Sequence, residues 1–284
     1  MVFIPRGNDV LNTNPATGVD EALSLHGSDW LWAVTAIYIV SFLGLLSLCF
    51  TARESDRVFH YLYTMALLVG AVTYFAQASD LGWSAVEQAD HLGHGMIRQI
   101  FFAKYINWVV AFPSFALGLG LLSGISWVTI VLNIFISWFW TLAYLAAAYT
   151  STDYKWGFFA FGTFSWIILA MSTLNECREA ANLLGVGRDY IMLAGYLNVL
   201  WVLYPIAFAL SDGGNIISVT SGFIFFGILD VLMLPVLSFA FVIMGRKWDF
   251  GKLNLAFSDY RVHREGAVSG GKEVAPAVDE ASVS

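Results

Sequence analysis

The sequence predicts an all-α protein, a bundle of seven helices that crosses a membrane. Two observations lead to this prediction. Of the 284 residues, 58% are hydrophobic and only 12% are charged, whereas a soluble domain carries about 25% charged residues. The chain also contains seven stretches that are free or almost free of charge and long enough, at about 20 residues, to cross a bilayer core as helices. The net charge of −7 argues against a nucleic-acid-binding protein, which would need a basic surface.

The charge-free intervals give the predicted helices in chain order. The first two cover 30–52 and 58–79. The interval 105–152 is too long for one span, and Ser123-Gly124-Ile125-Ser126 supplies a turn that divides it into the third and fourth helices. The last three are predicted at 156–175, 190–211 and about 215–245, and the seventh carries one acid, Asp230, in its middle.

Lysine and arginine in the short loops predict the orientation, because these residues collect on the cytoplasmic side of a membrane. With the N-terminus outside, the cytoplasmic side holds Arg53, Arg57, Arg178, Arg188, Arg246 and Lys247. We therefore expect 1–29 to be an extracellular segment, 30–245 to be the membrane domain and 246–284 to be a cytoplasmic tail. The tail has no periodic pattern of apolar residues, and we expect disorder from about residue 266.

Soluble-enzyme motifs are absent from the sequence. It contains no phosphate-binding loop, no zinc-ligand spacing and no serine elbow. We therefore expect no enzyme, no catalytic residue and no metal site.

Two charged residues stand out within the predicted spans, where charge is costly and is usually functional or paired. Asp230 lies in the middle of the seventh span. Lys104 lies at the outer start of the third span, where we expect its ammonium group to extend to the membrane interface. Polar and aromatic residues at matching depths in other helices accompany them.

Three motifs, in order and on the corresponding helices, resemble those of the microbial (type I) rhodopsins. The third helix contains Lys104-Tyr-Ile-Asn-Trp-Val-Val-Ala-Phe-Pro113, the sixth Trp201-Val-Leu-Tyr-Pro205 and the seventh Leu229-Asp-Val-Leu-Met-Leu234. The resemblance covers about 30–245 and implies a bundle of the microbial-opsin type. It also implies a former retinal pocket, formed by Tyr74, Tyr105, Asn107, Trp108, Phe159, Trp201, Tyr204, Phe208, Asp230 and Leu234.

The departures from these motifs fall on the residues that carry the photochemistry of the family. Leu234 occupies the position of the lysine that forms the retinal Schiff base, and leucine cannot form an imine. The resemblance therefore implies that retinal is not bound as a cofactor. The positions of the lost proton relay are occupied by Lys104, Asn107, Ala111 and Gly118.

This combination resembles the fungal opsin-related proteins, the branch that includes the yeast heat-shock plasma-membrane protein. The resemblance implies a plasma-membrane protein without photochemistry that acts through partners. We expect a stress-responsive regulator or chaperone-like stabiliser of membrane proteins, such as the proton-pumping ATPase. Three alternatives remain open: a receptor or carrier for an apolar ligand in the former retinal pocket, an ion or proton conduit, and a retinal photoreceptor.

Asp230 is the remaining piece of the former retinal site. Because the Schiff-base cation is missing, burial favours the neutral acid. We expect Tyr74 or Tyr204 to hydrogen-bond with it, although an ion pair with Lys104 is an alternative. We also expect Leu234 and the neighbouring aromatic side chains to occupy the volume of the retinal, because empty apolar space is costly.

Overall fold

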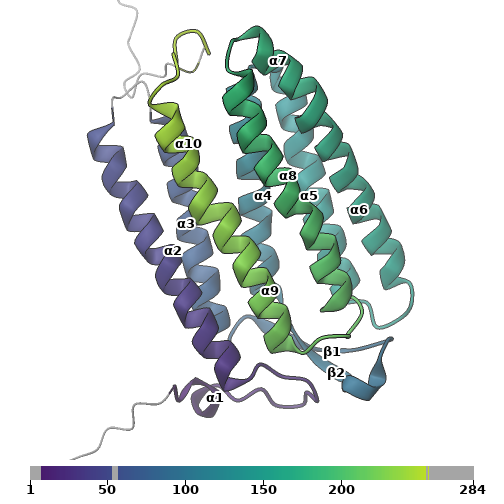
Figure 1. Cartoon of the computed structure of the whole chain (residues 1–284). Helices are drawn as coiled ribbons and strands as arrows, with labels where there is room; N and C mark the ends of the chain where they lie inside the picture. The colour runs from purple at the N-terminus through teal and green to yellow at the C-terminus, as the bar shows by residue number, and fades with distance from the viewer. Residues whose placement is uncertain (1–7, 53–56, 254, 256–284) are drawn as a thin grey trace, which may run out of the picture.

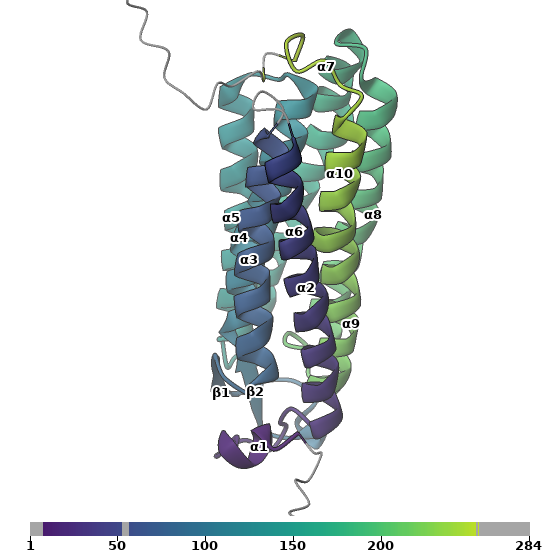
Figure 2. The ribbon, with the colours of Figure 1, turned by 90° about the vertical axis from the view of Figure 1, so that its left-hand side faces the viewer.

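Seven long apolar helices run side by side in the computed structural model, which describes residues 8–52, 57–253 and 255 (Figures 1 and 2). The first four are α2 (Leu25–Thr51), α3 (Val58–Ala78), α4 (Phe102–Ser123) and α5 (Trp127–Ala148). The fifth span comprises α6 (Lys155–Met171), a π-turn (Ser172–Glu176) and α7 (Cys177–Leu183). The sixth is α8 (Gly187–Leu210), and the seventh comprises α9 (Val219–Val231), a π-turn (Leu232–Val236) and α10 (Leu237–Gly245). The prediction of seven spans is confirmed.

Local sequence sets several of the helix ends. Ser24, Ser126 and Ser218 are N-caps whose hydroxyl groups accept hydrogen bonds from backbone N–H groups of the first turns. Ser24 explains why the first span begins earlier than residue 30. Gly124 ends α4 with φ +70°, a conformation that glycine adopts without strain. The turn predicted at 123–126 therefore lies where the sequence places it.

The outer surface of the bundle is apolar. Val40, Val128 and Phe161 are more than 60% exposed, on three different spans. Such a surface is unfavourable in water but suits contact with lipid chains. The interior, in contrast, contains both aromatic rings and a set of buried polar groups.

The end of the bundle that carries the N-terminal segment contains a β-hairpin, which the all-α prediction did not include (Figure 1). Strands β1 (Trp83–Glu87) and β2 (Ile97–Phe101) pair antiparallel. The N-terminal segment, which includes the short helix α1 (Val10–Thr13), joins this sheet where Glu21 bridges Arg98. Each strand has only five residues, too few for a periodic signal in the sequence.

At the opposite end, the chain folds back over the bundle after α10. Trp248, Phe250, Leu253 and Leu255 are all buried. The indole N–H of Trp248 donates a hydrogen bond to Asp189 at the start of α8, with a distance of 2.8 Å. The beginning of the predicted tail is thus packed against the helices, while the disorder expected from about residue 266 lies outside the described residues.

Candidate functional site

Asp230, at the end of α9, is the centre of a buried polar cluster. Its side chain is completely inaccessible to solvent. Four side chains from α3, α4 and α8 donate hydrogen bonds to its carboxyl oxygens: Tyr74 at 2.6 Å, Tyr204 at 2.5 Å, Trp108 at 3.1 Å and Asn107 at 3.2 Å. The two tyrosines expected from the sequence are both present. The carboxyl group therefore joins four spans through one set of hydrogen bonds.

A π-turn follows the acid and places Leu234 in the core. Pro235 lies within this turn and lacks the N–H group that an α-helix would use there, which accounts for the local change in winding. The backbone carbonyl of Asp230 accepts a hydrogen bond from the Tyr38 hydroxyl of α2 at 3.1 Å. Leu234 is completely buried four residues after the acid, so an apolar side chain stands next to the cluster.

Aromatic side chains from α4, α5 and α8 pack onto one another through Phe112. The ring centroid of Phe112 lies 5.9 Å from Trp108, 6.0 Å from Trp201, 4.6 Å from Trp140 and 5.0 Å from Tyr204. These distances are typical of direct ring contacts. The two tryptophans expected to form walls of the pocket are thus bridged by an aromatic side chain that the sequence analysis did not single out.

A second aromatic group contains two further expected pocket residues, Phe159 and Phe208. Phe159 and Phe208 stack with centroids 5.7 Å apart, and Tyr144 of α5 packs against both, at 5.3 Å and 4.5 Å. Tyr144 was not among the expected site residues. Its phenol lies close to Gly162, where an added Cβ would approach within 2.7 Å of its ring.

Lys104 does not extend to the membrane interface as expected, nor does it pair with Asp230. Its ammonium group is buried and forms an ion pair with Asp212, in the loop between α8 and α9. The Tyr105 hydroxyl donates to the same carboxylate at 2.8 Å. The Asp212 carboxylate lies within reach of the Lys104 ammonium group, and a buried cation that is paired with a carboxylate need not extend to water.

Arg98 of β2 is the second cation at this carboxylate. Its Nε lies 3.9 Å from Asp212 Oδ1, and its guanidinium group donates to the side chain of Asn215 at 2.9 Å. Burial alone would raise the pKa of Asp212, but Lys104 and Arg98 together hold that pKa below its usual value. Burial lowers the pKa of Arg98, against the attraction of Asp212.

The positions of the lost proton relay lie along α4. Asn107 faces Asp230, whereas Ala111 and Gly118 are buried further along the helix. At Gly118 an added Cβ would lie only 2.1 Å from the Tyr63 hydroxyl. The space of a donor side chain is therefore occupied by a tyrosine from α3.

The sequence analysis missed several contributions to this site, among them Tyr38, Phe112, Tyr144 and Asp212. Asp212 had a usable signal, because a buried Lys104 requires a counter-charge and Asp212 directly follows the sixth span. Tyr38 and Phe112 had none, since single aromatics are common in every span.

The family model described as "Bacteriorhodopsin-like protein" matches residues 28–244. The chain belongs to this family. The opsin-like protein carO of Fusarium fujikuroi is 34% identical over 264 residues, covering 89% of this chain and 86% of the relative. The 30 kDa heat shock protein of Saccharomyces cerevisiae is 30% identical over 258 residues, covering 81% and 75%. These fungal relatives confirm the predicted family branch.

A solved structure confirms the fold. The light-driven proton pump LR (Mac) from Leptosphaeria maculans superimposes with a TM-score of 0.76 at 26% identity, covering 80% of this chain and 99% of the pump. The seven spans of the present chain contain two lysines, and both lie in ion pairs. Lys104 pairs with Asp212, and Lys155 pairs with Asp90. The buried site around Asp230 provides hydrogen bonds and aromatic contacts. Leu234 occupies the position of the lysine whose amine forms the Schiff base in the pigments of the family.

Proposed function

We propose that this protein is a bacteriorhodopsin-like membrane protein without photochemistry, which binds no retinal and acts by contacting other membrane proteins. The absence of retinal binding and photochemistry is supported by Leu234, which is buried in the π-turn next to Asp230. The carboxyl group that would face a Schiff-base cation is instead surrounded by four hydrogen-bond donors of the protein itself. The site functions as a structural connection between helices.

The partner role is supported by similarity to the fungal relatives. One of them is named a heat shock protein, and the chain covers 75% of its length. A bundle with an extensive apolar outer surface has the surface needed to contact other membrane proteins laterally. We propose a stress-responsive regulator or chaperone-like stabiliser of plasma-membrane proteins, with the proton-pumping ATPase as the first partner to test. The N-terminus is proposed to lie outside and the C-terminus inside.

Affinity capture from native membranes tests this proposal. The full chain carries a tag and is purified with and without heat stress, and the co-purifying proteins are identified by mass spectrometry. We expect the proton-pumping ATPase to be enriched after stress. A tagged light-driven pump of the same fold, expressed at the same level, is the control because it shares the fold and the bilayer. Equal recovery of the ATPase with both proteins would contradict the proposal.

A receptor or carrier for an apolar ligand is the second candidate. One observation favours it: the buried indole N–H groups of Trp140 and Trp201 have no hydrogen-bond acceptor within the described part of the chain. The ring contacts of Phe112 with both tryptophans count against it, because they occupy the space between them. Lipid extraction of the purified protein distinguishes the two candidates, since a receptor would release one apolar ligand, other than a phospholipid, in a fixed ratio to protein.

A further inference from the structure

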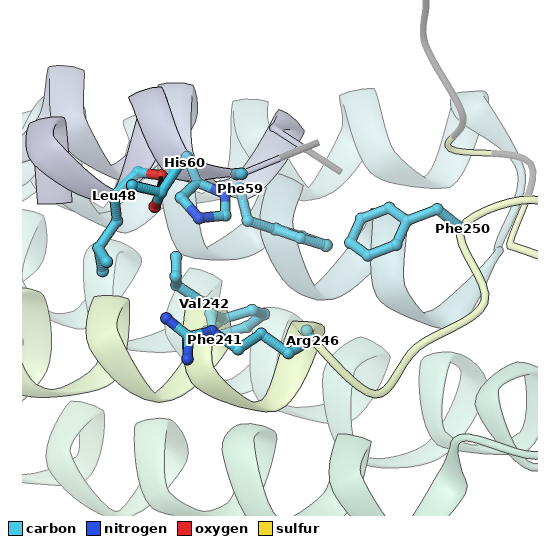
Figure 3. Close-up of a pocket in the computed structure, with 10 residues that line it drawn as sticks. Leu48, Phe59, His60, Phe241, Val242, Arg246 and Phe250 are labelled. Atoms are coloured by element: carbon cyan, nitrogen blue, oxygen red, sulfur yellow. Dashed lines mark hydrogen bonds between the residues drawn. The ribbon is translucent and has the colours of Figure 1, made fainter. Parts of the chain in front are cut away.

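A pocket of about 340 Å³ (Figure 3) is lined by helix ends that lie opposite the β-hairpin in Figure 1, and Asp230 is not among its lining residues. Its walls come from the end of α2, the start of α3 and the end of α10, and Phe250 of the returning C-terminal segment closes one side. This volume lies in the range of small-molecule sites. The helix ends place the pocket at the level where a bilayer passes from acyl chains to head groups.

One wall of the pocket is rigid and apolar. Phe59 and Phe241 pack with ring centroids 5.6 Å apart, and Phe59 lies 6.0 Å from Phe250. Trp248 supports this wall from behind, at 5.6 Å from Phe59. Aromatic rings held by several neighbours keep their positions, so the pocket is already formed before any ligand binds.

The same helix ends also contribute a cation and polar groups to the pocket. Figure 3 shows the guanidinium group of Arg246 folded back along α10 into the space that His60 borders from α3. Within the described part of the chain, no carboxylate pairs with Arg246 and no hydrogen bond is formed by its side chain. A guanidinium group next to a pocket, with five N–H donors in a planar fork, matches the geometry of a phosphate.

We propose that this pocket binds the head group of an anionic phospholipid. The phosphate is held by Arg246 with His60 beside it, and the glycerol and first methylene groups lie against the aromatic wall. Charge complementarity selects this occupant, because a basic pocket between helix ends attracts anionic lipids, and an apolar wall beside the cation suits a lipid better than a free ion. The proposal concerns a ligand site that is independent of the partner role proposed above.

A titration of the purified full chain tests the proposal. Dioctanoyl phosphatidylserine is added to the protein in a non-ionic detergent, and bound lipid is counted by native mass spectrometry. We expect one saturable lipid per chain, and a loss of affinity of about tenfold in Arg246→Gln, because a charge-assisted phosphate contact is removed. Lys247→Gln is the matched control, since Lys247 is the neighbouring exposed cation and does not line the pocket. Equal losses in both variants, or no loss in Arg246→Gln, would overturn the proposal.

Three further binding experiments identify the class of ligand. Thr51→Trp fills the rim from an exposed position while keeping Arg246, and should abolish saturable binding although the melting temperature stays unchanged. Phosphatidylcholine should bind more weakly than phosphatidylserine, because it is zwitterionic, whereas the additional carboxylate of phosphatidylserine gives that lipid a net negative charge. Millimolar inorganic phosphate should not displace the lipid. Displacement by phosphate, equal binding of phosphatidylcholine, or undiminished binding to Thr51→Trp would each contradict an anionic lipid site.

Discussion

Two substitutions of Asp230 distinguish whether this residue is a neutral structural acid or an ionised carboxylate. Asp230→Leu removes the acceptor of four buried donors at once. Among the hydrogen bonds of the described residues, the Tyr204 hydroxyl has a second acceptor, the Met233 sulfur at 3.7 Å. Each of the other three donors costs about 1–3 kcal/mol when left unpaired, so we expect a loss of at least about 3 kcal/mol.

Asp230→Asn should be tolerated if the acid is neutral. A neutral acid donates its own O–H to one tyrosine hydroxyl, and the NH₂ group of the new amide can replace that donor at Tyr204, while the remaining carbonyl keeps Tyr74 and Trp108. The expected loss is below about 1 kcal/mol. If the acid were ionised, the same change would replace several charge-assisted hydrogen bonds by weaker neutral ones. Thermal melting of both variants in detergent measures the difference, and an Asn variant that melts as low as the Leu variant would refute the neutral acid.

Three further predictions concern other parts of the site. Gly118→Ala should cost about 1–3 kcal/mol because its methyl group meets a buried tyrosine hydroxyl, whereas Gly157→Ala, in open space, should not lower the melting temperature. The depressed pKa of Asp212 means that its stabilising contribution is present above about pH 4 and is lost as the pH falls further. The melting temperature should therefore drop at acidic pH, while Asp212→Asn should lower it already at neutral pH by leaving two buried cations unpaired. Leu234→Lys should give at best a blue-shifted or acid-sensitive pigment that does not acidify the medium in light, because Asn107 cannot accept the proton.

The spans were predictable from the sequence because lipid imposes one strong condition, a length of about 20 residues without charge. The third and fourth helices illustrate this, since only the turn at Gly124 was needed to divide their common interval. The β-hairpin was not predictable, because strands of five residues between polar loop residues leave no periodic pattern. The fifth span was predicted too short, since its last turns continue past Glu176 into polar sequence.

The site at Asp230 was predicted where partners belong to sequence motifs, as Trp108 and Tyr204 do, and at Tyr74, which the family resemblance implied. It was predicted incorrectly where the partner depends on loop geometry. The expectation for Lys104 was wrong because the loop after α8 brings Asp212 to its ammonium group, a contact 108 residues apart in the chain. No local pattern determines such a distance, which follows only from the packing of α4 against α8.

Absorption spectroscopy with added all-trans-retinal tests the central claim most directly. The purified protein is incubated with retinal in the dark, next to a light-driven pump of the same fold as a positive control. Because Leu234 cannot form a protonated imine, we predict only the absorption of free retinal from this protein, and no product after borohydride reduction that links retinal to the chain. A stable red-shifted band, or a retinyl group attached to Lys104 or Lys155, would contradict the account.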